Sequence, residues 1–328
     1  MAQQTPIGFL KFTPQLMTKV WGGDKLHETF GKDKGQKIGE SWEISGVPQK
    51  VSVVCQGPFK GQSLTDLLNQ YGKRLVGEKV YAQYGKEFPL LFKFIDACED
   101  LSVQLHPDDA LAKERHKSFG KTEMWYVLQA DPGARLVIGF EPGTTMETYH
   151  KHLADHTITD ILNEIPVSAG DAFFIPPGLV HAIGAGVVLA EIQQTSDVTY
   201  RLFDWDRPDD NGQMRALHID EAEKALVFHD LAQVACTPKG LIEDQVKVVY
   251  ESLYFSTSVM RLTRPIVRNY YQNDSFVVLM CTRGSLTLSS DGLALMQMRK
   301  GESVLVPAEI ASIQISTQDA EILEVFVP

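Results

Sequence analysis

Short runs in which apolar and polar residues alternate make up much of this chain. Successive side chains of a strand point to opposite faces, so alternation over roughly four to eight residues indicates a β-strand. The runs are rich in β-branched and aromatic residues, which favour strands. They predict strands over residues 49–54, 89–95, 101–106, 123–128, 134–139, 172–176 and 187–193.

Helical patterns interrupt these runs. Residues 63–69 begin with Ser63, a favourable helix N-cap, and their leucines are spaced for one face of a helix. Further helices are predicted over 107–116, 144–164 and 220–227. Short strands with irregular helical insertions predict a mainly β fold, a jelly-roll-like barrel that carries helices at its edges.

One histidine follows a rigid turn. The strand that opens at Gly170 ends in the sequence Pro-Pro-Gly, and His181 starts the next strand. Because prolines and a glycine fix the direction of the backbone there, the His181 ring is held in place before an ion arrives, as a metal ligand requires. The turn therefore makes His181 a candidate metal ligand.

Three side chains on nearby predicted strands complete a possible ligand set. Gln104 and His106 alternate along one strand and share a face, while Glu123 shares a face of another strand with Lys121. Two imidazoles, a carboxylate and an amide oxygen suit Zn²⁺ or a neighbouring first-row ion, because thiolates are absent and the ligands are not all oxygens. We therefore predict one divalent metal ion, held by Gln104, His106, Glu123 and His181.

Each of these residues also has an ordinary structural interpretation. A strand histidine such as His106 is more often a hydrogen-bonded core residue than a ligand. Glu123 beside Lys121 could form an exposed ion pair that contributes little free energy. The Pro-Pro-Gly turn could be a plain strand connection. The presence of all four residues on predicted strands within one stretch favours the metal site.

The last third of the chain repeats the strand pattern. Residues 276–281 and 285–288 read as strands on either side of a turn at Gly284. Residues 301–307 then copy the spacing of residues 170–176, from a glycine to a proline. The repeat predicts a second barrel related to the first.

The second barrel differs from the first in its candidate ligands. When the two glycines are aligned, Glu309 stands opposite Gly178 and Ser312 stands opposite His181. The second barrel has therefore kept the turn and lost the histidine. We predict a first domain over residues 1–235, which carries the metal site and the helical inserts, and a degenerate barrel without metal ligands over residues 236–328.

Composition narrows the range of partners. The chain of 328 residues has 31 Lys and Arg against 42 Asp and Glu, a net charge of −11, which argues against a nucleic acid or an anionic membrane as a partner. Its 4 cysteines include no C-x-x-C pair, so a thiolate metal site is not expected and reduced cytoplasmic thiols fit best. Neither a signal-like start nor a membrane-length apolar segment is found. We expect a soluble cytoplasmic monomer or homodimer that binds a small molecule.

Ordered motifs along the chain resemble those of a known family. The glycines, proline and histidine of residues 170–181 fill a cupin motif, and Gln104-x-His106 resembles another cupin motif with glutamine in place of its first histidine. Within the cupins, essentially the whole chain resembles the type I mannose-6-phosphate isomerases, in a shorter bacterial form. The motifs that carry this resemblance lie at 19–23, 39–45, 91–93, 102–108, 121–125 and 191–201.

The resemblance implies two cupin-type jelly-roll barrels and a zinc-dependent aldose-ketose isomerase. Such an enzyme interconverts mannose 6-phosphate and fructose 6-phosphate through an enediol, with one Zn²⁺ per chain on the four ligands named above. A proton beside a carbonyl is very weakly acidic, so the developing enediolate needs a cation near its oxygens, and Zn²⁺ is suited to act as that Lewis acid.

The resemblance also implies roles for other residues. Arg201 matches the active-site arginine of the family and Asp197 its usual companion, although without the resemblance the two would be interpreted as a surface ion pair. The permanent charge of Arg201 suits it to a phosphate or enediolate oxygen and not to proton abstraction. Glu191 and Lys121 both remain candidates for moving the proton.

Further residues are predicted to bind the substrate. Ser102 and Lys93 resemble phosphate- or hydroxyl-contacting positions of the family, and Asp197 accompanies Arg201. Glu43 and Trp21 could line the sugar, although a core or surface role explains these two equally well. The predicted substrate contacts are thus Ser102, Lys93, Asp197, Glu43 and Trp21.

The sequence departs from the family on the phosphate side. After Arg201 the chain reads Leu-Phe-Asp-Trp-Asp-Arg, whereas longer members continue with Ala-Gly-x-Thr-Pro-Lys, so their phosphate-side lysine has no counterpart. Arg207 is the candidate that the sequence offers there. Two other functions stay open: a non-catalytic cupin that binds a sugar phosphate and regulates a partner, and a metal oxygenase that uses Fe²⁺.

Overall fold

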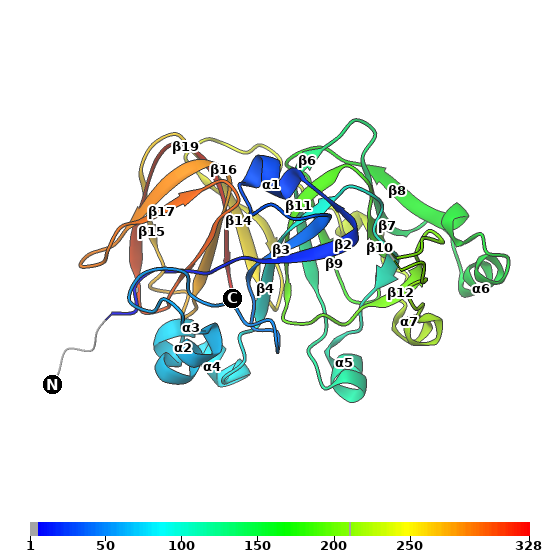
Figure 1. Ribbon diagram of the computed structural model, residues 1–328, viewed down its shortest axis with the longest axis horizontal. Coiled ribbons are helices and arrows are strands. Elements are labelled where there is room, and N and C mark those ends of the chain that lie inside the picture. Colours follow the sequence, from blue (N-terminus) through cyan, green and yellow to red (C-terminus); the bar gives the residue numbers. More distant parts are fainter. Residues whose placement is uncertain (1–5, 210) are drawn as a thin grey trace.

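A computed structural model describes residues 6–209 and 211–328 of the chain. Strands dominate it and form two barrels that lie side by side, the first drawn mainly in cyan and green and the second in yellow to red (Figure 1). The predicted mainly β fold is confirmed. Helices are short and lie at the edges of the barrels.

The first barrel consists of two antiparallel sheets. The six-stranded sheet contains, in spatial order, β2 (Gln15–Gly23), β3 (Ile38–Ile44), β4 (Leu90–Ala97), β11 (Val187–Gln194), β6 (Glu123–Ala130) and β9 (Ala172–Ile175). The five-stranded sheet contains β12 (Tyr200–Phe203), β5 (Val103–Leu105), β10 (His181–Ile183), β7 (Arg135–Phe140) and β8 (Leu162–Pro166). The inner faces of both sheets meet in one apolar core, in which Ile95 and Leu189 of one sheet pack with Leu136 and Ile138 of the other.

The second barrel is a single eight-stranded sheet. Its main path runs through β1 (Leu10–Lys11), β18 (Ser303–Val306), β16 (Val277–Ser289), β19 (Ser312–Phe326), β14 (Ser256–Leu262) and β13 (Val246–Glu251). Two further strands complete it, β15 (Ile266–Asn269) on β19 and β17 (Met296–Arg299) on β16. Gly170 and Gly301 both have positive φ and both lie two residues before a four-residue strand, β9 or β18. The repeat of strand spacing between the barrels is thus present in the structure.

The helices lie outside the barrels. They are α1 (Lys25–Phe30), α2 (Leu64–Tyr71), α3 (Lys73–Val76), α4 (Glu78–Tyr84), α5 (Asp109–His116), α6 (Met146–Ala154) and α7 (Ile219–Ala225), with short 3₁₀ helices η1 (Ile158–Ile161) and η2 (Leu231–Gln233). Ser63 caps α2 as predicted, because its hydroxyl accepts a hydrogen bond from the Asp66 amide and the Asp66 carboxylate accepts one from the Ser63 amide. Among the described residues, no helix has the length and apolar character needed to cross a membrane.

The two barrels are joined by a strand pairing and by a shared apolar cluster. Strand β1, near the start of the chain, pairs with β18 of the second barrel, with Leu10 opposite Leu305. Aromatic residues on the outer face of β4, Phe92 and Phe94, share a buried cluster with Phe276 of the second barrel. The division into residues 1–235 and 236–328 stays a prediction, and the first of these ranges contributes a strand to the sheet of the second.

Two predicted elements are wrong in part. Residues 49–54 form no strand, because Gln49 has a φ of +67° and the Lys50 amide donates to the Val47 carbonyl in a turn. Only isolated bridges remain there, at Val53 and Val54. The predicted helical stretch 144–164 contains α6 and η1, but β8 takes its last residues.

The predicted turn at Gly284 is also wrong. The chain passes through Gly284 within one long strand, β16, whose register against β19 shifts on both sides of the glycine. Gly284 has a φ of +70°, and a Cβ atom there would lie 1.9 Å from the Asp319 carbonyl oxygen. A bulge that needs glycine therefore replaces the turn.

Candidate metal centre and substrate pocket

Three of the four predicted metal ligands form one buried cluster between the two sheets of the first barrel. His106 follows β5, Glu123 opens β6 and His181 opens β10. Each side chain offers a ligand atom, and these atoms all lie within 4.8 Å of one another. The Glu123 carboxylate lies 3.4 Å from His106 Nε2 and 3.8 Å from His181 Nε2.

Backbone carbonyls orient both imidazole rings. His106 Nδ1 donates to the Val198 carbonyl at 3.0 Å, and His181 Nδ1 donates to the Leu179 carbonyl at 2.9 Å. Because a carbonyl accepts only, each Nδ1 carries the proton and each Nε2 keeps its lone pair for a ligand. His181 Nε2 has no hydrogen-bond partner among the described residues.

The Pro-Pro-Gly turn links the two histidine segments. The Gly178 amide donates to the His106 carbonyl at 2.9 Å, so the turn before His181 is fixed to the segment of His106. Gly178 has a φ of +80°, and a Cβ atom there would lie 2.5 Å from the Ala225 carbonyl oxygen. The turn therefore requires glycine, for its backbone angle and for the close approach of the chain.

Burial sets the charges of the three clustered residues. Burial, together with the nearby Lys121 ammonium, lowers the pKa of His106 to about 3, and burial also lowers the pKa of His181. Burial alone would raise the pKa of Glu123, but the Lys121 ammonium at 2.7 Å holds it well below its usual value. Two neutral imidazoles and a carboxylate result, and this donor set fits a divalent cation such as Zn²⁺.

Gln104 and Lys121 border the cluster. Gln104 lies directly opposite His181 in the pairing of β5 with β10, and its side-chain oxygen accepts a hydrogen bond from the Ser102 hydroxyl at 3.1 Å. Lys121 Nζ lies 2.7 Å from the Glu123 carboxylate and 3.1 Å from His106 Nε2. The structure thus places Gln104 where an amide oxygen could join the ligand set, and Lys121 in direct contact with two of its members.

A row of four side chains crosses the six-stranded sheet beside the cluster. Trp42, Lys93, Glu191 and Trp125 stand opposite one another on β3, β4, β11 and β6. The Glu191 carboxylate pairs with Lys93 Nζ at 2.7 Å and accepts a hydrogen bond from Trp125 Nε1 at 3.0 Å. Lys93 Nζ also lies 5.2 Å from the centre of the Trp42 ring. All four residues line one pocket.

Glu40 is a charged residue of this pocket that was not predicted as a site residue. Its carboxylate pairs with Lys19 Nζ at 3.0 Å and accepts a hydrogen bond from Trp42 Nε1 at 2.6 Å. Both lysine and glutamate belong to sequence motifs that carried the family resemblance, at 19–23 and 39–45. That resemblance was the available signal, whereas the local pattern alone marks Glu40 only as a strand residue.

Glu40 leads to a prediction about stability and pH. Burial alone would raise its pKa, but Lys93 and Lys19 outweigh burial and lower it from 4.5 to about 2. Because the pKa of Glu40 is lower in the folded chain than in the unfolded chain, the charged carboxylate stabilises the fold at pH values above the unfolded pKa of 4.5. This stabilisation is lost as the pH falls through 4.5 toward 2. Glu40→Gln should therefore lower the free energy of unfolding at neutral pH by about 3 kcal/mol.

Denaturant unfolding at pH 7, 5 and 3 checks this expectation. The gap in unfolding free energy between the natural chain and Glu40→Gln should shrink at the lowest pH. Glu28→Gln, an exposed change on α1, is the matched control and should show no such gap. A gap for Glu40→Gln that stays constant across the pH range would contradict the charge-based explanation.

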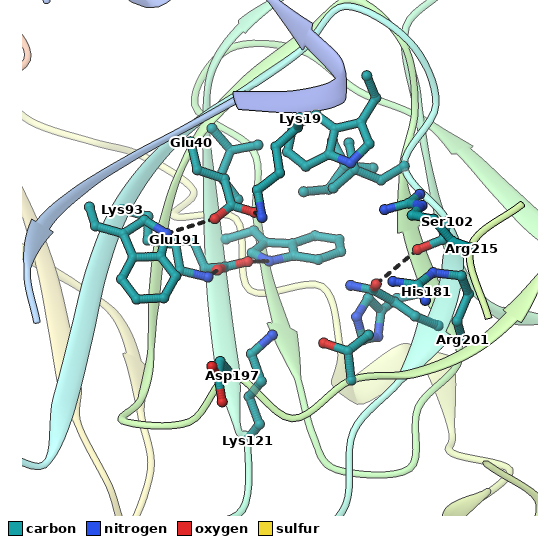
Figure 2. A pocket seen from close by; sticks show the side chains of 18 residues that line it. Lys19, Glu40, Lys93, Ser102, Lys121, His181, Glu191, Asp197, Arg201 and Arg215 are labelled. Carbon is teal, nitrogen blue, oxygen red and sulfur yellow. Dashed lines mark hydrogen bonds and ion pairs between the residues drawn. The ribbon is translucent and has the colours of Figure 1, made fainter. Parts of the chain in front are cut away.

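Arginines and Ser102 form the other side of the pocket. Figure 2 shows Ser102, His181, Arg201 and Arg215 on one side and Lys19, Glu40 and Lys93 on the other. Arg201 is half-buried, and its Nη1 donates to the Ala216 carbonyl at 2.9 Å. Asp197 is exposed and also lines the pocket, but it forms no ion pair with Arg201 in the described structure.

Two residues suggested by the sequence lie outside the pocket, whereas Trp21 lines it. Glu43 points to the opposite face of β3 from Glu40, where it pairs with Lys32 Nζ at 2.7 Å and accepts a hydrogen bond from Ser41 at 2.6 Å. The placement of Glu43 at the substrate is therefore corrected: its position in the strand alternation turns it away. Arg207 pairs with Glu99 and Asp204 and does not line the pocket.

Fold and site together define a class. Two antiparallel β-barrels, one of which buries a His-Glu-His set beside a charged pocket, are typical of a cupin-type enzyme. The pairing of β10 with β5 and the turn at Gly178 bring this set together from distant parts of the chain.

Comparison with known proteins identifies the family. Residues 9–149 match "Phosphomannose isomerase type I, catalytic domain", and residues 245–327 match "Mannose-6-phosphate isomerase, cupin domain". The chain is 36% identical to mannose-6-phosphate isomerase of Streptococcus mutans over 94% of this chain and 95% of that protein. It is 32% identical to mannose-6-phosphate isomerase ManA of Bacillus subtilis over 91% and 92% of the two chains. The chain belongs to the type I phosphomannose isomerase family and is an enzyme of that family.

A solved structure agrees with this assignment. The crystal structure of mannose 6-phosphate isomerase from Bacillus subtilis superposes with a TM-score of 0.84 at 29% identity and covers 97% of this chain and 99% of that one. The cupin-type fold predicted from the motifs is therefore confirmed. The catalytic-domain match covers Gln104, His106 and Glu123 but ends before His181 and Arg201, which the structure places beside them.

Proposed function

We propose that this enzyme interconverts D-mannose 6-phosphate and D-fructose 6-phosphate through an enediol or enediolate, with one Zn²⁺ per chain. The observation that carries the proposal is the unpartnered Nε2 of His181, which faces a buried carboxylate and a second neutral imidazole beside a charged pocket. The names of the relatives supply the substrate, because at 36% and 32% identity over almost the whole chain they are mannose-6-phosphate isomerases.

Gln104, His106, Glu123 and His181 would hold the zinc ion. When bound, the ion would supply Lewis-acid stabilisation for negative charge that develops on the substrate oxygens. The fixed Nδ1 hydrogen bonds of both histidines keep the ligand set in place without the ion. A preorganised set of this kind loses little free energy in reorganisation when the ion and substrate arrive.

Lys121 and Glu191 are the two groups proposed to move the proton between C1 and C2. Lys121 lies against the metal ligands, with Nζ 2.7 Å from Glu123. Glu191 lies in the row across the sheet, where Lys93 and Trp125 engage its two oxygens. Both line the same pocket, so either could reach a bound sugar, and both stay candidates.

A coupled assay of mannose 6-phosphate turnover tests the proposed function. We expect turnover by the purified chain, loss of turnover after chelation, and recovery when Zn²⁺ is returned. The physical reason is that chelation would remove the Lewis acid that stabilises negative charge on the enediolate oxygens. Full zinc occupancy with tight binding of mannose 6-phosphate and no isomerisation would instead support a sugar-phosphate-binding regulator.

A further inference from the structure

We propose that Arg215, together with Arg201, binds the phosphate group of the substrate, and that the buried Asp204 positions Arg215 for this role. The proposal rests on the proposed function, because it names the part of the pocket that recognises the anionic end of the sugar. Arg215 lies in the irregular segment that follows β12, and it lines the same pocket as Arg201.

The segment after β12 folds back on itself and brings Arg215 to the pocket. It leaves β12 at Phe203, and a bridge between Pro208 and Met214 marks a tight reversal. The Asp209 amide donates to the Gln213 carbonyl at 2.8 Å across this reversal. Arg215 consequently returns beside the strand that the chain has just left.

Asp204 fixes the Arg215 side chain. The carboxylate of Asp204 is 4% exposed, and it accepts hydrogen bonds from Arg215 Nε at 2.6 Å and from Arg215 Nη2 at 2.5 Å. This two-point contact fixes the plane of the guanidinium. Arg215 Nη1 has no bond to any other described residue, so its N–H groups stay available on the pocket side, which Arg215 lines.

The backbone after Arg215 holds the two arginines together. Arg201 Nη1 donates to the carbonyl of Ala216, the next residue after Arg215. The His218 amide donates to the Arg201 carbonyl at 2.8 Å, and the Arg201 amide donates to His218 Nδ1 at 3.2 Å. The segment 215–218 therefore runs beside Arg201 and places both guanidinium groups on one wall, as Figure 2 shows.

This wall is the part of the pocket with spare donors. Lys19, Lys93 and Lys121 each form an ion pair with a glutamate at 3.0 Å or less. Arg201 forms no ion pair with a carboxylate among the described residues, and its buried Nε has no partner. Burial and the charge of Arg215 lower the pKa of Arg201, so an anion placed between the two arginines would relieve their repulsion.

A phosphate group matches this arrangement. It carries a charge near −2 and several acceptor oxygens, and arginine offers planar N–H donors suited to two of those oxygens at once. Ser102 lies on the same side of the pocket, but its single hydroxyl proton is donated to Gln104, so the two arginines supply the free donors on this side. His181 and Gln104 of the proposed ligand set line the same pocket, so the C1–C2 end of the sugar would lie at the metal and the phosphate at the arginines.

The test compares Arg215→Gln with Arg207→Gln in the metal-loaded full chain. Arg207 shares the Asp204 carboxylate but does not line the pocket, so it is a matched control. Calorimetric titration with inorganic phosphate and steady-state kinetics with mannose 6-phosphate are the two measurements. For Arg215→Gln we expect phosphate affinity to fall and KM to rise, each by roughly 10- to 100-fold, with kcat changed much less. Arg207→Gln should match the natural chain in both.

Asp204→Asn tests the positioning role. It removes the charge that holds Arg215 while both Arg215 and Arg207 remain, so KM should rise and phosphate binding should weaken in the same direction as for Arg215→Gln. A variant damaged only in folding would lose kcat and zinc content as well, and both are measured. Unchanged KM and phosphate affinity in Arg215→Gln overturn the inference.

The two measurements separate this inference from the proposed function. If the natural chain isomerises mannose 6-phosphate and Arg215→Gln behaves like it, the inference fails and the proposed function stands. If the natural chain shows no isomerisation but binds inorganic phosphate, and Arg215→Gln loses that binding, the anion site stands and the proposed function fails.

Discussion

Replacement of His181 by alanine is expected to release the metal ion and to lower kcat for mannose 6-phosphate by at least ~10³-fold. His181 offers the Nε2 that has no partner among the described residues, and its ring is held by the Leu179 carbonyl. Among the described residues, no other His, Cys, Asp or Glu joins His106 and Glu123 in this cluster to replace it. Elemental analysis of purified protein and steady-state kinetics measure the two effects.

His152→Ala is the matched control for this variant. His152 lies on α6, outside the cluster, and donates from Nδ1 to Thr157. It should keep full zinc content and kcat. Circular dichroism should show that His181→Ala stays folded, since the turn at Gly178 remains. Normal zinc content in a folded His181→Ala protein would falsify the proposed ligand set.

The second large effect is expected for Arg201→Ala, which should lower kcat/KM by roughly 10²- to 10³-fold while zinc content and folding stay normal. Arg201 is half-buried at the pocket and makes no ion pair that its loss would break among the described residues. The substitution therefore removes a positive charge from the substrate pocket and should cost the fold little stability. Kinetics, elemental analysis and thermal unfolding measure the three quantities.

Arg283→Ala is the control for Arg201→Ala. Arg283 lies in the second barrel, where it pairs with Asp319 at 2.7 Å near the surface. It should leave kcat/KM unchanged, because exposed ion pairs contribute little free energy. Equal losses in both variants would mean that loss of an arginine, and not of the pocket charge, lowers the rate.

The metal cluster was largely predictable because its signals are local. Alternation in one strand put Gln104 and His106 on a shared face, and the Pro-Pro-Gly turn marked His181. The structure brings His106, Glu123 and His181 together. What the sequence could not supply was the register of β10 against β5, which sets Gln104 opposite His181.

Arg215 could not be predicted as a pocket residue from the sequence, because it belongs to no strand, helix or motif that would indicate its position. It lies in an irregular segment after β12, and a chain reversal together with its contact with Asp204 brings it to the pocket. Arg207 stands nearer to Arg201 in the chain, but it does not line the pocket. Proximity along an irregular segment does not predict proximity in space, since a single reversal at Pro208 and Met214 changes which side chain faces inward.

Glu43 could have been placed correctly by a stricter use of strand alternation. Trp42 and Glu43 are neighbours in β3, so only one of them can face the pocket, and the pocket-lining pair is Glu40 and Trp42. The false turn at Gly284 has a different origin. Glycine marks both turns and bulges, and only the pairing partner, here β19, decides between them.

The pairing of β1 with β18 bears on how the protein is assembled during synthesis. Leu10 leaves the ribosome long before Leu305, its partner, has been translated. Contacts between residues so distant in sequence close late, because the intervening chain must first be made and ordered. The first strand of the chain therefore cannot pair with β18 until almost the whole polypeptide has been translated.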